Sequence, residues 1–189
     1  EKVIKINSHH AYAHNNLGIM FDKLGDYQKA INCYKIAIEI NPNNTEAYYN
    51  LGKAFYVLKE DQKAIECFEK AIKINPNYAH AHNNLGIIFN KLCYSQKAIE
   101  CFEKAIKINP NYALAHNNLG IAFDNLNKSQ KAIECFEKAI KIFPGFSEAK
   151  WNLHGNASNI NEALTILKEI NNTDNKHIKS KIMVSALEG

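Results

Sequence analysis

The chain has 189 residues, of which 23 are basic and 19 acidic, and its net charge is +4. All of its basic residues are lysines. Because arginine supplies the planar group that binds phosphates and guanine edges through paired hydrogen bonds, its absence disfavours sequence-specific binding of nucleic acid. No apolar run reaches the roughly 20 residues that span a bilayer, so the sequence predicts no membrane partner.

A 34-residue period governs most of the chain. The segment QKAIECFEKAIKI occurs three times unchanged, beginning at Gln62, Gln96 and Gln130, and a variant of it begins at Gln28. Its apolar residues recur with the three- and four-residue spacing of an amphipathic helix. Short polar side chains are expected to cap these helices: Asp26, Asp61, Ser95 and Ser129. A proline closes each unit, because the residue before it avoids helical angles: Pro42, Pro76, Pro110 and Pro144.

The first half of each unit is predicted to be another helix, and it contains one glycine of a series: Gly18, Gly52, Gly86 and Gly120. A glycine inside a helix costs about 1 kcal/mol relative to alanine, so its presence needs a structural reason. We expect it to let the paired helix approach closely, against the small alanines of that helix: Ala30, Ala37, Ala64, Ala71, Ala98, Ala105, Ala132 and Ala139. Gly86→Leu is therefore predicted to lower stability.

This order of small residues, aromatic residues and a closing proline resembles the tetratricopeptide repeat (TPR), a 34-residue helix–turn–helix unit. The resemblance covers four complete units between Ala11 and Phe146. It implies an all-α fold, an α-solenoid of antiparallel helix pairs that winds into a right-handed superhelix. One family feature differs, because other residues replace the early tryptophan of the first helix: His14, Tyr48, His82 and His116.

The repeat also divides the chain. We predict a single domain over residues 1–189, in which residues 1–10 are the tail of a preceding repeat, so that at least one more unit lies upstream. Four complete repeats, a degenerate fifth repeat and a C-terminal capping helix follow: 11–44, 45–78, 79–112, 113–146, 147–173 and 174–189.

The residues that could carry chemistry follow the repeat and do not converge on one site. Three histidines share one repeat position, and a cysteine recurs in each unit: Cys33, Cys67, Cys101 and Cys135. Equivalent positions in stacked units lie about 10 Å apart, too far for one metal ion or for a disulfide. We therefore predict reduced thiols, a cytoplasmic location, no metal or cofactor, and no catalytic residue.

Asparagines recur on the first helices, which line the concave groove in this family: Asn16, Asn50, Asn84, Asn118 and Asn152. The series resembles the asparagine ladder in the TPR superhelix of O-GlcNAc transferases, where the amides hold a peptide backbone. An amide offers both a donor and an acceptor, as an extended backbone requires. The alternative is that these amides cap or bridge neighbouring helices, or reflect duplication and codon bias.

Other groove positions differ between repeats although the second helices are identical. One series contains Tyr12, Glu46, His80 and Leu114, a second contains Ile19, Lys53, Ile87 and Ile121, and a third contains Asn15, Tyr49, Asn83 and Asn117. The predicted groove therefore includes six side chains besides the asparagines: Tyr12, Tyr49, Lys53, Ile87, Ile121 and Leu114. Drift after duplication is the alternative explanation of this variation.

These features predict a non-catalytic scaffold that binds a partner peptide or helix in its groove. The lysine set that holds C-terminal carboxylates in co-chaperone repeats is missing, because Ile19 and Ile87 occupy matching positions. Two alternatives remain open: a regulatory or substrate-recruiting arm of a larger enzyme such as a glycosyltransferase, and self-association through exposed repeat ends.

Overall fold

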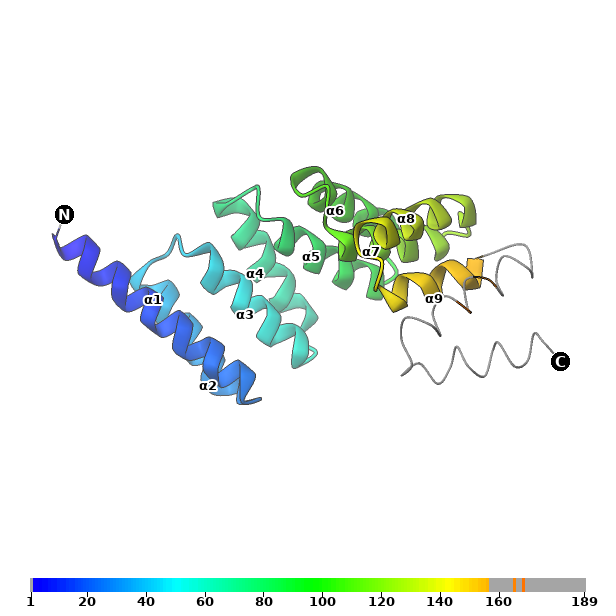
Figure 1. Cartoon of the computed structure of the whole chain (residues 1–189). Helices are drawn as coiled ribbons and strands as arrows, with labels where there is room; N and C mark the ends of the chain where they lie inside the picture. Colours follow the sequence, from blue (N-terminus) through cyan, green and yellow to red (C-terminus); the bar gives the residue numbers. More distant parts are fainter. Residues whose placement is uncertain (1, 157–164, 166–167, 169–189) are drawn as a thin grey trace. The chain divides into compact units, whose positions relative to one another are not determined.

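A computed structural model of the chain describes residues 2–156, 165 and 168. Helices form all of the regular secondary structure within this described part (Figure 1). The helices are α1 (Lys2–Lys23), α2 (Tyr27–Ile40), α3 (Thr45–Val57), α4 (Asp61–Ile74), α5 (Ala79–Lys91), α6 (Ser95–Ile108), α7 (Ala113–Asp124), α8 (Ser129–Ile142) and α9 (Ser147–Asn156). The prediction of an all-α helical repeat solenoid is confirmed.

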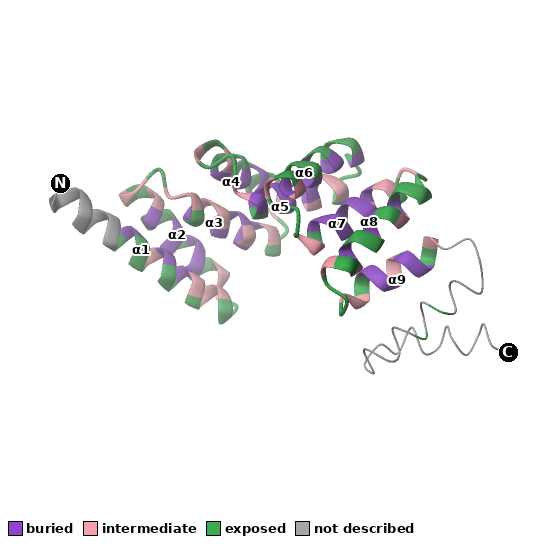
Figure 2. Cartoon of the chain, turned by 45° about the horizontal axis from the view of Figure 1, so that its top comes forward, coloured by how far each residue is buried: buried purple, intermediate pink, exposed green. Residues whose placement is uncertain are grey.

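The described residues fall into two compact units, which are divided between Ile88 and Phe89. In the first unit α1 packs on α2, α2 on α3, and α3 on α4. In the second unit α6 packs on α7, α7 on α8, and α8 on α9. Within each unit, buried residues lie on the sides of the helices that face a neighbouring helix (Figure 2). This sequential packing is what stacked helix pairs require.

The first helix is longer than the other first helices. α1 runs without interruption from Lys2 to Lys23 and so crosses the boundary predicted between residues 10 and 11. Ser8 stands at the repeat position that Pro42 and Pro76 occupy in later units. Because serine keeps its backbone N–H and leaves helical angles open, the helix continues where proline would end it.

Only one of the four expected N-caps has the expected role. Asp26 caps α2, since its Oδ1 accepts a hydrogen bond from the backbone N–H of Lys29 at 3.2 Å. The expectation is wrong for Asp61, Ser95 and Ser129, which are the first residues inside α4, α6 and α8. The cap is the residue before each of them.

The turn inside each repeat explains this shift. It passes through the left-handed backbone region, with φ of 77°, 64°, 62° and 55° at Gly25, Lys59, Cys93 and Asn127. Glycine adopts this conformation without strain, whereas other residues lose about 1–2 kcal/mol. The residue after the left-handed one is the N-cap of the second helix in all four repeats. It is the predicted Asp26 in the first repeat, and it lies one position before the predicted residue in the other three.

Three glycines of the series, Gly18, Gly52 and Gly120, pack against aromatic rings. A Cβ atom on Gly120 would lie 2.4 Å from Cε1 of Phe136, and one on Gly52 would lie 2.8 Å from Cε1 of Phe68. Both rings are buried, with exposed fractions of 1%. The expectation that alanines face the glycines is therefore wrong, because a ring needs the volume that the missing side chain leaves.

Each repeat also places a lysine of its second helix over a phenylalanine of its first helix. The lysine Nζ lies 5.3–5.6 Å from the ring centroid in the four pairs Lys29–Phe21, Lys63–Phe55, Lys97–Phe89 and Lys131–Phe123. A cation this close to a ring face is attracted by its quadrupole. The contact therefore braces the two helices of a repeat beside their connecting turn.

Beyond the fourth repeat, α9 occupies the start of the predicted fifth repeat. The rest of that repeat and the capping helix lie outside the described residues, apart from 165 and 168, and remain predictions. In the described part of the chain, no helix has the length and apolar character needed to cross a membrane.

Candidate functional site

The first helices are joined by a series of side-chain hydrogen bonds. The amide Nδ2 of Asn50 donates to Oδ1 of Asn15 at 3.1 Å, and Nδ2 of Asn152 donates to Oδ1 of Asn117 at 3.0 Å. Nδ2 of Asn84 donates to the hydroxyl of Tyr49 at 3.3 Å. In each pair the acceptor lies 35 residues earlier, so one repeat is bonded to the next through their first helices.

These bonds change the interpretation of the predicted asparagine ladder. Asn50 and Asn118 are buried, Asn84 and Asn152 are half-buried, and Asn16 is exposed. The alternative considered from sequence, that the amides bridge neighbouring helices, describes the contacts of Asn50 and Asn152. A role in holding a ligand backbone remains a prediction.

The residues that accept these bonds share the repeat position of Asn15, Tyr49, Asn83 and Asn117, which was predicted to line the groove. Three of them have no exposed surface: Asn15, Asn83 and Asn117. Asn117 is bonded on both sides, since its Nδ2 also donates to Oε1 of Glu148 at 3.2 Å. Asn15 and Asn117 each accept a hydrogen bond from the following repeat, although Nδ2 of Asn15 has no hydrogen-bond partner in the described part of the chain. These buried amides therefore help to specify how the first helices meet. The recurrence of these asparagines every 34 residues is the sequence feature from which their role between the first helices could have been predicted.

Asn50→Ala is expected to lower the free energy of unfolding by about 1–3 kcal/mol, because it leaves Oδ1 of the buried Asn15 without its donor. Urea-induced unfolding followed by circular dichroism measures the change. Asn16→Ala is the matched control, since Asn16 occupies the same repeat position but is exposed. Equal losses in the two variants would contradict a bridging role for Asn50.

A small cavity opens between α3 and α5 in the first unit. Its volume is about 220 Å³, and its walls are formed by Lys53, Tyr56, Val57, Asn84 and Ile87. Three of these residues were predicted from sequence as groove residues: Lys53, Asn84 and Ile87. The cavity therefore combines apolar side chains with one amide and one ammonium group.

Tyr49 supports the amide of Asn84, which lines this cavity. Its ring packs edge-on against Tyr78, with centroids 5.2 Å apart, and lies 5.8 Å from the ring of Phe68. Burial raises the pKa of Tyr49, and burial raises that of Tyr78 to about 12. Both phenols are therefore neutral at physiological pH, and the Tyr49 hydroxyl holds Asn84 by a neutral hydrogen bond.

Lys53 is held in place by two contacts. Its Nζ lies 3.8 Å from Oδ2 of Asp22 on α1 and 5.9 Å from the ring centroid of Tyr49. The lysine side chain keeps 43% of its surface exposed, so its charge is largely hydrated and the ion pair is weak. The ammonium group therefore remains accessible to an acidic or carbonyl group of a ligand at the cavity mouth.

The other predicted groove residues do not line this cavity. Tyr12 on α1 is exposed over 59% of its surface, and Leu114 on α7 over 38%. Ile121 is half-buried and packs against the core cluster around Phe136 and Leu153. Its hydrophobic surface is thus partly used by the fold of the second unit.

Two of the three histidines that share a repeat position, His82 and His116, brace the connections between repeats. Nε2 of His82 lies 2.9 Å from the carbonyl oxygen of Pro76, and Nε2 of His116 lies 3.0 Å from that of Pro110. A histidine thus ties the start of a first helix to the turn before it. No cluster of three or more potential metal ligands occurs among the described residues.

The four cysteines that recur every 34 residues are buried within the second helices and are called here the cysteine ladder: Cys33, Cys67, Cys101 and Cys135. Cys93, in contrast, is exposed in a turn. Burial raises the pKa of Cys67 to about 12 and that of Cys135 to about 11. Because the thiolate is the reactive form, these thiols stay protonated and unreactive at neutral pH. No disulfide joins the five cysteines, all of which lie in the described part of the chain.

We expect one thiol per chain to react rapidly with Ellman's reagent at pH 8, and this thiol to be Cys93. Cys93→Ser should abolish the rapid phase, while unfolding in urea should expose the four remaining thiols of that variant. The absorbance of the reaction product, recorded at neutral and alkaline pH, measures the number of thiols that react in the folded and in the unfolded chain. A rapid phase that survives in Cys93→Ser would show that the ladder is accessible.

Comparison with known proteins shows which family this repeat architecture belongs to. Models described as TPR repeat match residues 20–59 and 96–127, and models of the tetratricopeptide repeat match residues 45–78, 67–92 and 113–146. No curated protein matches the chain. The stacked helix pairs define an all-α helical-repeat protein. The chain belongs to the tetratricopeptide repeat family.

Solved structures of the same fold include a crystal structure of MamA, which is 31% identical, with the alignment covering 86% of this chain and 96% of that chain at a TM-score of 0.76. PilF of Pseudomonas aeruginosa is 20% identical over 96% of this chain and 84% of its own, with a TM-score of 0.86. YrrB, described as a TPR protein with an unusual peptide-binding site, is 22% identical over 97% and 96%, with a TM-score of 0.73.

Proposed function

We propose that the chain is a non-catalytic scaffold for protein–protein interaction and that it binds an extended peptide segment of a partner against α3 and α5. The observation that carries the proposal is the cavity of about 220 Å³ between these two first helices. A cavity of this size accommodates one apolar side chain of a ligand. The amide of Asn84 and the ammonium group of Lys53 in its walls provide polar contacts for the adjoining backbone.

The pattern of variation supports this location. The second helices of repeats two to four carry identical segments, whereas the positions of three lining residues, Lys53, Tyr56 and Val57, differ between repeats. Lys53, Ile87 and Ile121 share one position, and Tyr56 is replaced by asparagine and then aspartate in the next two repeats. Variation confined to an accessible face is what a specific binding surface requires, because identical repeats would offer identical contacts.

The amide of Asn84 still has capacity for a ligand. Its Nδ2 donates to Tyr49 and its Oδ1 accepts from Asn83 at 3.3 Å. An amide carries two N–H donors and two acceptor sites, so one of each remains. Asn84 is thereby pre-oriented, which lowers the entropy that binding must overcome.

The expected affinity is modest. Burial of one aliphatic side chain contributes about 1.5–3 kcal/mol, and a hydrogen bond about 0.5–1.5 kcal/mol. Association itself costs at least about 4 kcal/mol, so a single pocket and one amide do not suffice. A ligand must therefore contact further side chains of the first helices. YrrB shows that this fold is able to present a peptide-binding site.

The test uses a peptide selected on the wild-type chain from a random displayed library. Ile87→Asp places a charge in the apolar wall and should weaken its binding at least about tenfold in a calorimetric titration. Ile36→Asp is the matched control, because Ile36 lies on the second helix α2 and is 38% exposed. Circular dichroism confirms that each variant is folded. Unchanged affinity in Ile87→Asp would reject this site.

A further inference from the structure

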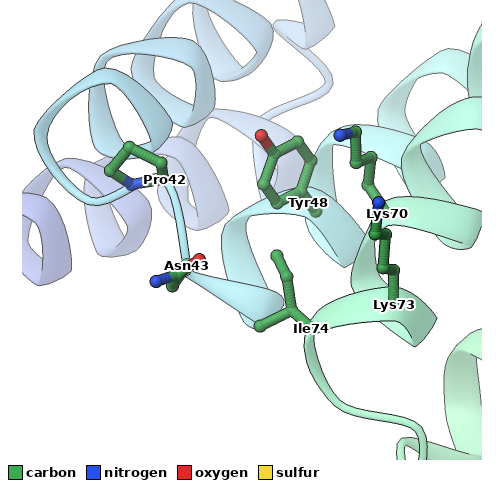
Figure 3. Close-up of a pocket in the computed structure, with 6 residues that line it drawn as sticks. All are labelled: Pro42, Asn43, Tyr48, Lys70, Lys73 and Ile74. Atoms are coloured by element: carbon green, nitrogen blue, oxygen red, sulfur yellow. The ribbon is translucent and has the colours of Figure 1, made fainter.

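A larger cavity lies at the connection between the first two repeats, and it shares no residue with the cavity described above. Its volume is about 700 Å³, and its walls are formed by Pro42, Asn43, Tyr48, Lys70, Lys73 and Ile74. Figure 3 shows the ring of Tyr48 between the α2–α3 connection on one side and the two lysines of α4 on the other. All six residues belong to the first unit.

The charge in this cavity comes from the end of α4. Lys70 and Lys73 are three residues apart and therefore share one face of the helix. In the described part of the chain neither lysine is within ion-pair distance of a carboxylate, whereas Lys29 and Lys63 are paired with Asp26 and Glu60. Two unpaired ammonium groups on one wall favour an anionic ligand.

The nearest carboxylates to these lysines on α4 line a neighbouring cavity. Glu66 and Glu69 line, with the same two lysines, a cavity of about 340 Å³ along α4. They precede the lysines by one helical turn and reduce the local positive potential without forming ion pairs. The wall opposite Lys70 and Lys73 in the larger cavity contributes only neutral groups, from Pro42, Asn43 and Tyr48.

Tyr48 distinguishes this connection from its counterparts. His82 and His116 occupy the same repeat position, and each is bonded to the carbonyl oxygen of the proline six residues earlier. Tyr48 has no such bond to Pro42 within the described part of the chain, and its ring instead lines the cavity. The lysines, the proline and the isoleucine recur in later repeats, so the tyrosine is what makes this copy different.

We propose that this cavity binds a carboxylate side chain of an acidic peptide segment. The two lysines neutralise the carboxylate, Tyr48 offers a hydroxyl donor, and Pro42 and Ile74 contact the methylene stem or an adjacent apolar residue. The volume and the apolar walls favour a peptide side chain over a small inorganic anion, which would leave most of the cavity unfilled. The net charge of +4 adds a general attraction for acidic partners.

The test is a titration of the full ¹⁵N-labelled chain with hexaglutamate, observed by NMR. Shifts should concentrate at Asn43, Tyr48, Lys70 and Lys73. The double variant Lys70→Gln/Lys73→Gln should bind at least about fivefold more weakly, since it removes two exposed ion pairs. Lys104→Gln/Lys107→Gln is the matched control, because it makes the same change in an identical sequence segment.

A further variant tests the tyrosine. Tyr48→His converts the position to the residue of the next two repeats and should also weaken hexaglutamate binding. The proposal is overturned if the Lys104/Lys107 control loses as much affinity as the Lys70/Lys73 variant, or if neither loses any. Shifts reproduced by inorganic phosphate at equal concentration would likewise overturn it in favour of a simple anion site.

Discussion

Gly120→Leu is expected to destabilise the chain by about 3 kcal/mol, because overpacking a well-filled core costs this much. Even the first added carbon would lie 2.4 Å from Cε1 and 2.7 Å from Cδ1 of Phe136. The ring is only 1% exposed and is enclosed by Ala132 and Leu153, so it has little room to move. The gain of helix propensity, about 1 kcal/mol, offsets only part of the loss. The midpoint of urea-induced unfolding measures the effect.

Gly155→Leu provides the control for this prediction. Gly155 lies in α9 of the same unit, and a Cβ atom there would have no neighbour within 4 Å. Its replacement should therefore leave the midpoint unchanged or raise it slightly. If both glycine variants behaved alike, close packing could not be the reason for glycine at position 120.

Phe136→Ala is expected to cost about 3–5 kcal/mol, because it removes a fully buried ring and leaves a cavity in the core. Ile121, Phe123, Ile133 and Ile140 pack around this cluster and would lose contacts with the ring. The same urea titration measures the loss. A cost below about 1 kcal/mol would mean that the core collapses into the space.

The double variant Gly120→Leu/Phe136→Ala connects the two predictions. If the glycine exists to make room for the ring, leucine should fill part of the space that alanine leaves. The double variant should then be less destabilised than the sum of the two single variants, with a coupling energy of about 1 kcal/mol or more. Additive losses would show that the two positions act independently.

The polar bonds between first helices have a consequence for specificity. Asn15 and Asn117 accept hydrogen bonds from the following repeat and are inaccessible. The cavity between α3 and α5 is lined instead by Lys53, Tyr56 and Ile87, together with Asn84 and Val57. Recognition by this chain is thus expected to depend on a few side chains that differ between repeats, and less on a uniform row of amides.

About half of the candidate site could be predicted from the sequence. Lys53 and Ile87 were predicted because their repeat position varies on a helix whose partner helix is constant, and Asn84 was predicted because asparagine recurs there every 34 residues. The structure brings these three residues to one cavity. Val57 and the supporting contact of Asp22 were missed. Val57 lies four residues after Lys53 on α3, so helical spacing places it on the same face, whereas no spacing in the sequence relates Asp22 on α1 to the cavity.

Sequence alone determined the class of fold. Four units with one period must form equivalent helix pairs, because each repeats the same apolar stripe and the same closing proline. Only the tertiary structure decided which polar residues remain accessible. Asn15 and Asn16 are adjacent asparagines on one helix, yet one is fully buried and the other exposed. Burial depends on the side of α1 to which each is directed and on the helix that covers it, and residue type carries neither piece of information.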